Sequence, residues 1–234
     1  MIGKFLIGAE CVALSLIVLS TLAHRLGLFS FKPAIALFAL GVLLSLVVVI
    51  VGIGALLFAS VSWKVSAGAL TVGLLPIAFM VLAVGVKGFQ VPRIHDISTD
   101  LDRPLVFTKV PEIRAKDDNS IAPPSDVVTE LQRQHYPDIK PLLTSLNMEP
   151  AFQKALMTVS KLGWEIVYQD GDLGLIEAVD ETVMFGFKDD VVIRVSDDEN
   201  GSRVDMRSVS RVGLSDLGAN AKRIRRFQKA FNAQ

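Results

Sequence analysis

Two polar stretches contain the residue types from which binding and acid–base sites are built. The first is IHDISTD, residues 94–100, in which a histidine stands beside acidic and hydroxyl side chains. A histidine next to a carboxylate can bind a cation or act in an acid–base pair. The second is RVGLSDLGANAKR, residues 211–223, which begins and ends with arginine. Polar stretches that are distant in sequence often come together in one site.

Together the two stretches predict a candidate polar site for a small ligand or a reaction. The competing interpretation is structural, with Asx and ST turns in residues 94–100. It also has an ion pair between Arg211 and Asp216, and it has the Asn220 amide satisfying backbone groups. We favour the structural interpretation, so no catalytic residue is assigned. The candidate residues are His95, Asp96, Asp100, Arg211, Ser215, Asp216, Asn220 and Arg223.

Metal and cofactor chemistry has no recognisable motif in this sequence. The one cysteine, Cys11, lies in an apolar run, and the three histidines are far apart: His24, His95 and His135. Neither pattern has the spacing of a metal-binding motif. No nucleophile stands at a recognisable spacing from a base. We therefore predict no metal and no cofactor, and an enzyme is the less favoured function.

Four basic residues share one face of a helix predicted near the C-terminus: Lys222, Arg225, Arg226 and Lys229. This face either contacts anionic lipid headgroups or an acidic partner, or it is a solvated face that suits the C-terminal end of a helix. No aromatic residue is interleaved with the four, and the rest of the region is acidic. Both observations argue against a nucleic-acid partner.

The elements that would carry these residues begin with three apolar runs. They are Phe5–Ala23, Pro33–Val61 and Val65–Val86. A transmembrane helix needs about 20 apolar residues, and each run approaches or exceeds that length. The connections, 24–32 and 62–64, are short enough to be turns at a bilayer surface, with Trp63 and Lys87 as interfacial anchors. The sequence therefore predicts a three-helix membrane anchor in residues 1–90.

The first run also resembles a secretory signal, because it ends in the small residues TLA. The acid Glu10 within it, and the two runs that follow, favour a retained helix. An intramembrane carboxylate predicts a proton relay or a partner for a cation. The alternative, which we favour, is that Glu10 reaches the interface near Lys4.

The remainder divides by composition into a linker and a domain. Residues 91–146 are polar, acidic and proline-bearing, which predicts an extended tether with one helical turn near 125–134. Residues 147–234 predict an α+β domain: a helix at 147–163, about five mainly antiparallel strands, and a closing helix. Both helices are expected on one face of the sheet, in a two-layer sandwich.

Two details of this domain are specific enough to be checked. Strands are expected at 164–169, 173–179, 183–187, 190–196 and 203–209, with Arg194, Asp205 and Arg207 on a charged face opposite the buried one. Ser215 is expected to cap the closing helix. The core stripe of that helix is expected to begin at Leu217 and to continue through Ile224, Phe227 and Phe231.

The same two polar stretches carry a family resemblance. Ile94-His95-Asp96-Ile97 with Thr99 and Asp100 is similar to an entry motif of an uncharacterised bacterial family, the domain of unknown function fourteen ninety-nine. The second motif is matched by Arg207-Ser208, Arg211, Gly213, Ser215-Asp216, Gly218, Asn220 and Arg223. The resemblance extends from about Gln90 to Phe231 and implies no reaction or ligand.

The side of the membrane on which the domain lies is predicted differently by two arguments. The positive charges that flank the spans favour the cytoplasm by a margin of two. Shorter members of the family resemble exported lipoproteins, which implies a periplasmic domain. We follow the resemblance. The expected protein is a multi-pass protein of the bacterial cytoplasmic membrane with a binding or scaffolding role in the envelope, and its partner is another envelope protein or anionic lipid.

Overall fold

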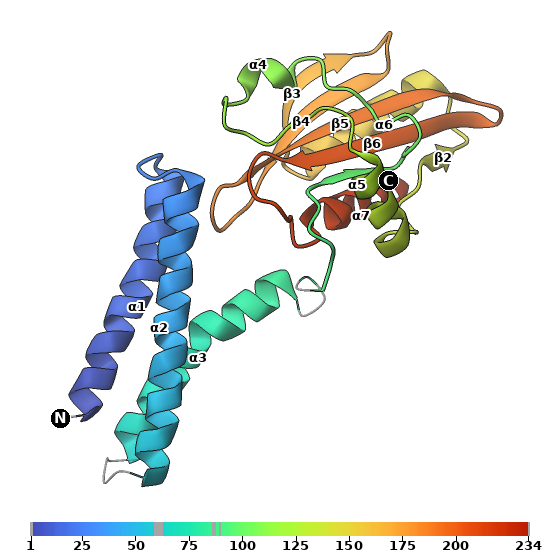
Figure 1. Ribbon diagram of the computed structural model, residues 1–234. Coiled ribbons are helices and arrows are strands. Elements are labelled where there is room, and N and C mark those ends of the chain that lie inside the picture. The colour runs from blue at the N-terminus through green and yellow to red at the C-terminus, as the bar shows by residue number, and fades with distance from the viewer. Residues whose placement is uncertain (1, 59–62, 86–87, 89, 234) are drawn as a thin grey trace. The chain divides into compact units, whose positions relative to one another are not determined.

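The computed structural model describes residues 2–58, 63–85, 88 and 90–233 of the 234. The chain forms two compact units (Figure 1). One contains Met1–Phe89 and Val183–Gly186, and the other contains Gln90–Thr182 and Phe187–Gln234.

The first unit is built from three apolar helices: α1 (Ile2–Arg25), α2 (Phe31–Phe58) and α3 (Trp63–Val84). By length and composition, α1 and α2 can each cross a membrane. The part of α3 that is described as continuously apolar is shorter, Leu70–Leu82. The predicted ends Val61 and Val86, the turn residue Ser62 and the anchor Lys87 lie outside the described residues.

Glycines set the close packing of these helices. A Cβ atom at Gly41 of α2 would lie 2.7 Å from Ile17 Cγ1 and 2.8 Å from the carbonyl oxygen of Ala13, both in α1. Gly73 of α3 has a similar role against α2. Small residues let apolar helices approach closely, which strengthens their van der Waals contact.

Glu10 faces into this helix packing, so the expectation that it reaches the interface is wrong. Its side chain is 4 % exposed. Its Oε1 accepts a 3.0 Å hydrogen bond from Ser45 Oγ of α2. The carboxylate therefore joins two helices and does not extend along α1 toward water.

The second unit contains a six-stranded antiparallel sheet in the order β1-β6-β5-β4-β3, and β2 also pairs with β6. The antiparallel prediction is thus confirmed. The expected strand at 183–187 is wrong, because these residues form the turn between β4 and β5, closed by a 2.8 Å bond from Thr182 N to Phe187 O. The strands are β1 (Asp96–Ser98), β2 (Leu142–Thr144), β3 (Glu165–Asp170), β4 (Leu175–Glu181), β5 (Lys188–Asp198) and β6 (Gly201–Ser210).

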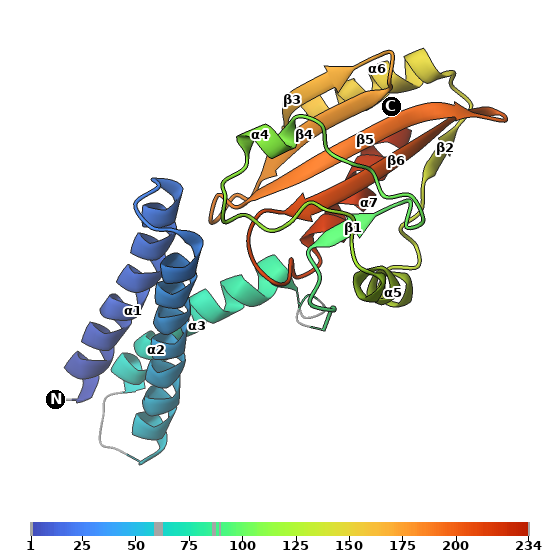
Figure 2. The same cartoon turned by 45° about the horizontal axis from the view of Figure 1, so that its top comes forward.

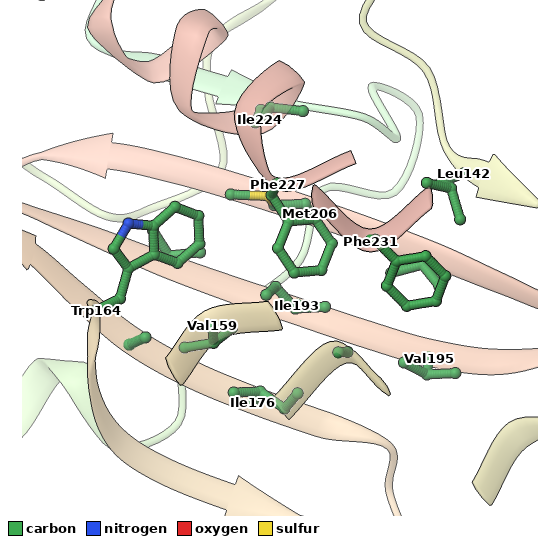
Figure 3. Close-up of a cluster of buried hydrophobic side chains, with 14 of the residues drawn as sticks. Leu142, Val159, Trp164, Ile176, Ile193, Val195, Met206, Ile224, Phe227 and Phe231 are labelled. Atoms are coloured by element: carbon green, nitrogen blue, oxygen red, sulfur yellow. The ribbon is translucent and has the colours of Figure 1, made fainter. Parts of the chain in front are cut away.

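Two helices, α6 (Met148–Lys161) and α7 (Ala219–Asn232), cover one face of the sheet (Figure 2). Alternate residues of β5 and β6 point into the core, as their sequence pattern predicts. Figure 3 shows Phe227 of α7 between Trp164 and Phe231, above Ile193. Phe227 stacks on Trp164 with 6.1 Å between the ring centroids.

The opposite face of the sheet is covered by residues 99–122, including α4 (Val110–Ile113). Figure 2 shows α4 and its flanking chain in front of the sheet, with α6 and α7 behind. Leu105, Phe107 and Val110 pack on Val192 and Val209 in a second apolar cluster. The expectation of a solvated charged face is therefore wrong, because Asp205 and Arg207 are fully buried beneath this layer.

The stretch predicted as a linker is structured and belongs to the domain. Residues 91–146 contain β1, α4, α5 (Asp126–His135) and β2. β1 and β2 pair with β6 through Ile97↔Ser208 and Leu143↔Arg203. Polar composition did not reveal this, because strands of three residues carry almost no periodic signal.

Candidate functional site

The first motif is held to the sheet by a buried ion pair between Asp96 and Arg207. Arg207 Nε and Nη2 donate to the two Asp96 oxygens at 3.0 and 2.7 Å. The same guanidinium donates to the carbonyl oxygens of Leu105, Ile121 and Ala122. It also lies 5.5 Å from the Phe107 ring centroid, within range of a cation–π contact. The carbonyl and cation–π contacts fasten residues 99–122, the covering layer, to β6, and the ion pair fastens β1 to it.

Arg211, just after β6, is paired with Asp190 of β5, so the expected ion pair with Asp216 is wrong. Its Nη2 and Nε donate to Asp190 Oδ1 at 2.7 and 3.1 Å. Arg114, just after α4, donates to the other oxygen of the same carboxylate. Asp190 is fully buried, and both arginines are nearly so. A buried carboxylate with two charged donors has its acceptor positions filled.

Asn220 and Arg223 of α7 meet β6 and β1 in a third buried cluster. The Asn220 side-chain amide donates to the His95 carbonyl at 3.0 Å and to Ser210 Oγ at 2.9 Å. Its oxygen accepts from Ser208 Oγ and from Arg223 Nη1, both at 2.6 Å. Both donors of this amide and both acceptor positions of its oxygen are therefore used.

Arg223 also connects α7 to the end of the sheet through two carboxylates. Its Nε donates to Asp180 at 2.7 Å, and its Nη2 donates to Asp189. Burial raises the pKa of Asp189, whereas the positive charge of Arg223 acts in the opposite direction. Asp180 is the more exposed of the two carboxylates.

The entry to α7 differs from the prediction in the residue that caps the helix. Asp216 Oδ1 accepts from Gly218 N at 2.7 Å, and Oδ2 accepts from Asn220 N at 2.9 Å. Ser215 only closes a turn, accepting from Leu217 N at 3.3 Å. The prediction that Ser215 caps α7 is therefore wrong. The helix begins at Ala219, because Leu217 and Gly218 both have positive φ angles that a helix cannot contain.

The same turn moves Leu217 out of the predicted core stripe. Its side chain is 38 % exposed. The stripe begins with Ala221 and continues through Ile224, Phe227 and Phe231, all of which are buried. The expectation for Leu217 is thus wrong, and that for the three later residues is confirmed.

Among the candidate residues of the first motif, Asp100 has a local structural role. Its Oδ1 accepts from the backbone N–H groups of Asp102 and Arg103, an Asx turn of the expected kind. Its Oδ2 accepts from Arg203 at 3.2 Å. His95 is half-buried, and its backbone carbonyl also accepts from Ser210 N.

The basic face of α7 is partly engaged within the domain. Arg225 forms an exposed bidentate pair with Asp138 at 2.6 and 2.8 Å. Arg226 donates to the carbonyl oxygen of Leu162 at 2.8 Å. Lys222 and Lys229 are exposed on the same face. Arg225 and Arg226, which were proposed for lipid or partner contact, thus also join α7 to neighbouring segments.

Two buried polar residues of structural importance were missed by the sequence analysis. Glu177 of β4 accepts from three successive backbone N–H groups, those of Thr108, Lys109 and Val110, and so fixes the start of α4. Gln132 of α5 pairs with both backbone groups of Ser98 in β1. A single acid inside the apolar strand LIEAV was the available signal for Glu177.

The geometry brings part of the candidate site together and separates the rest into distinct pairs. Asn220, Arg223 and the His95 carbonyl share one hydrogen-bonded cluster. Asp96 and Arg211 each have a different partner. The residues that the structure describes contain no group of three or more His, Cys, Asp or Glu side chains that could hold a metal ion. A role for these residues in ligand binding stays a prediction.

These observations define a class of protein: an antiparallel α+β domain, fastened internally by buried arginine–carboxylate pairs and attached to apolar N-terminal helices. Residues 96–231 match the sequence model of the family described as "Protein of unknown function (DUF1499)", so the chain belongs to that family and the resemblance found in its motifs is confirmed. No curated protein sequence matches the chain.

Proposed function

We propose that this chain is an integral protein of the bacterial cytoplasmic membrane, anchored by α1, α2 and α3. Its α+β domain is a binding or scaffolding module of the cell envelope that catalyses no reaction. The anchoring part is supported by the length and apolar composition of α1 and α2. Ile94, only ten positions after the last residue of α3, is already buried in the domain core. A connection of this length reaches at most about 35 Å, so the domain works near the bilayer.

The observation that carries the non-enzymatic role is the saturation of the motif side chains. Arg207, Asn220 and Asp96 are buried, and their donors and acceptors end on other groups of the domain. A catalytic group must instead present a reactive atom to a substrate. These family-typical residues therefore support a structural role, which leaves the exposed surface to bind a partner.

The alternative is a membrane-tethered enzyme or small-ligand binder whose site is built from the two motifs. One observation favours it: the Tyr136 hydroxyl is buried without a hydrogen-bond partner, near Gly218 of the second motif. A single hydroxyl is a weak basis for a site, because the neighbouring motif groups are already paired. We therefore keep the binding or scaffolding role as the main proposal.

A topology experiment tests the anchoring and the side of the membrane. Alkaline phosphatase, which is active only outside the cytoplasm, and a green fluorescent protein, which fluoresces inside, are fused in turn after Gln234. We expect phosphatase activity without fluorescence, and release of neither fusion by an alkaline carbonate wash. Fluorescence alone would overturn the periplasmic location, and release by carbonate would overturn the anchor.

Photocrosslinking tests the binding role. Leu214, in the middle of the second motif, is 77 % exposed, so a side chain at this position is accessible to a partner. A photoreactive amino acid at Leu214 should give one discrete crosslinked product in intact cells, whereas the same group at exposed Asp117 should not. Identical patterns at both positions, with a monomeric chain in mild detergent, would overturn the role.

A further inference from the structure

The strongest unexplained group in the chain is the carboxyl of Glu10, in the first unit. It lies eight residues into α1, which corresponds to about 12 Å along the helix axis. Its side chain is buried among α1, α2 and α3. Its Oε1 is held by Ser45 Oγ, whereas Oε2 is buried and has no hydrogen-bond partner among the residues that the structure describes.

The space beside Oε2 is created by a glycine of the third helix. A Cβ atom at Gly73 would lie 3.3 Å from Glu10 Oε2 and 2.8 Å from Val49 Cγ2. It would also lie 3.4 Å from the carbonyl oxygen of Ser45. Any larger residue would thus press on the carboxyl and on the α2 surface. Groups from three helices therefore surround the carboxyl oxygen Oε2.

The charge of this carboxyl has no protein counterion among the described residues. No ion pair to Glu10 is formed in that part of the chain, where its one polar contact is Ser45. The other ionisable residues of α1 are Lys4, Cys11, His24 and Arg25, while α2 carries Lys32 and α3 carries Lys64. All except Cys11 lie toward helix ends, and Cys11 is exposed on another side of α1. A carboxylate without a cation is strongly disfavoured inside a bilayer.

We propose that Glu10, Ser45 and Gly73 form a proton-binding site inside the helical anchor. The proton forms an O–H bond with Oε2 and cancels the charge of the carboxylate, while Ser45 keeps Oε1 in place. When the proton leaves, it passes to water, and the carboxylate regains its charge. The site rests on the proposed membrane anchoring but concerns a different activity from partner binding by the domain.

A metal cation fits the groups around Glu10 less well than a proton does. Calcium takes six to eight oxygen ligands, and other hard cations also need several. The described residues offer here one carboxyl, one hydroxyl and one nearby backbone carbonyl. A proton needs only one unpartnered oxygen, which is Oε2 of Glu10.

Labelling with a carbodiimide tests the site directly. Dicyclohexylcarbodiimide is apolar and reacts with protonated carboxyls in membranes, leaving a stable acylurea that peptide mass spectrometry locates. With the full chain in liposomes, we expect labelling at Glu10 that declines as the pH rises and is absent in Glu10→Gln. A water-soluble carbodiimide should label exposed Glu149 and spare Glu10.

Glycine variants provide a matched control that leaves Glu10 in place. Gly73→Ala places a methyl group against Oε2 and Val49 and should lower the labelling of Glu10 several-fold. Gly68→Ala lies in the same helix, where an added Cβ would meet nothing within 4 Å, and should label like the parent chain. The comparison therefore remains informative even if Glu10→Gln does not fold.

Four results would overturn the proposal. They are no modification of Glu10 at any pH, labelling that is independent of pH, equal labelling of the two glycine variants, or protection by sodium at constant pH. Protection by sodium would show that the site binds a metal cation and not a proton. Labelling of Glu10 by the water-soluble reagent, together with release by carbonate, would instead refute the membrane anchor itself.

Discussion

Arg207 shows at the scale of one residue how the domain accommodates charge in its interior. It is the largest fully buried side chain, and it contacts Asp96 and three backbone carbonyl oxygens. We expect Arg207→Met to reduce the free energy of unfolding by about 3–5 kcal/mol, because it leaves a buried carboxylate without its partner. Denaturant titration of the full chain in detergent measures this change.

A control separates this effect from a general loss of arginine. Arg133 forms an exposed pair with Asp102, and Arg133→Ala should cost at most about 1 kcal/mol. Adding Asp96→Asn to Arg207→Met should recover part of the loss, since the uncompensated charge is removed. Equal effects of Arg207→Met and Arg133→Ala would contradict the burial argument.

Tyr136 gives a prediction about pH. Burial, followed by the charge of Asp216, raises the pKa of Tyr136 to about 12, although Arg225 acts in the opposite direction. The folded state therefore holds this proton more tightly than the unfolded state, whose tyrosines titrate near pH 10. The resulting stabilisation is complete below about pH 10 and is lost as the pH rises toward 12.

Ultraviolet titration checks the pKa of this hydroxyl directly. Tyr168→Phe leaves Tyr136 as the single tyrosine. Its tyrosinate absorbance should rise at higher pH in the folded chain than in the urea-unfolded chain. Coincident titration curves would show that the hydroxyl is exposed.

The candidate residues were predictable from the sequence, but their partners were not. The first motif and the second were recognised by residue type. Asp190 and Arg114, which complete the Arg211 pair, stand in stretches without a motif. An ion pair across the fold depends on strand register and on the path of the covering layer. Neither of these is encoded locally.

At the scale of elements, α7 depends on Asp216 for its start. Asp216→Ala should reduce the free energy of unfolding by about 1–2 kcal/mol, because two backbone N–H groups lose their acceptor. Ser215→Ala, one position away, should have a much smaller effect, since it loses only a 3.3 Å turn contact. Thermal unfolding of both variants checks which substitution destabilises the domain more. A larger loss of stability for Ser215→Ala would show that Ser215 is the capping residue.

The reliability of the predicted elements followed the strength of their periodic pattern. α6, α7, β5 and β6 were found because their apolar residues repeat at helix or strand spacing. The strand expected at 183–187 was wrong because VMFGF forms a turn, in which Gly186 has a φ of 72°. A run of apolar letters alone does not distinguish a strand from a turn.

At the scale of the whole molecule, the domain extends well beyond the boundary at residue 147. Residues 90–146 supply two strands and the second apolar cluster. We therefore expect a fragment of residues 90–234 to unfold cooperatively in water, and a fragment of residues 147–234 to lack a cooperative transition. Circular dichroism during heating distinguishes them, and cooperative unfolding of the shorter fragment would show that the covering layer is dispensable.

The pairing of β6 also has a consequence for synthesis. β5 occupies one edge of β6, and β1 and β2 share the other, at Arg207–Val209 and Ser202–Val204. An unpaired strand edge is a template for aggregation. β6 is the last strand to leave the ribosome, and its neighbours on both sides precede it in the chain. A nascent chain can therefore close the sheet as soon as β6 emerges, without exposing that edge to other chains.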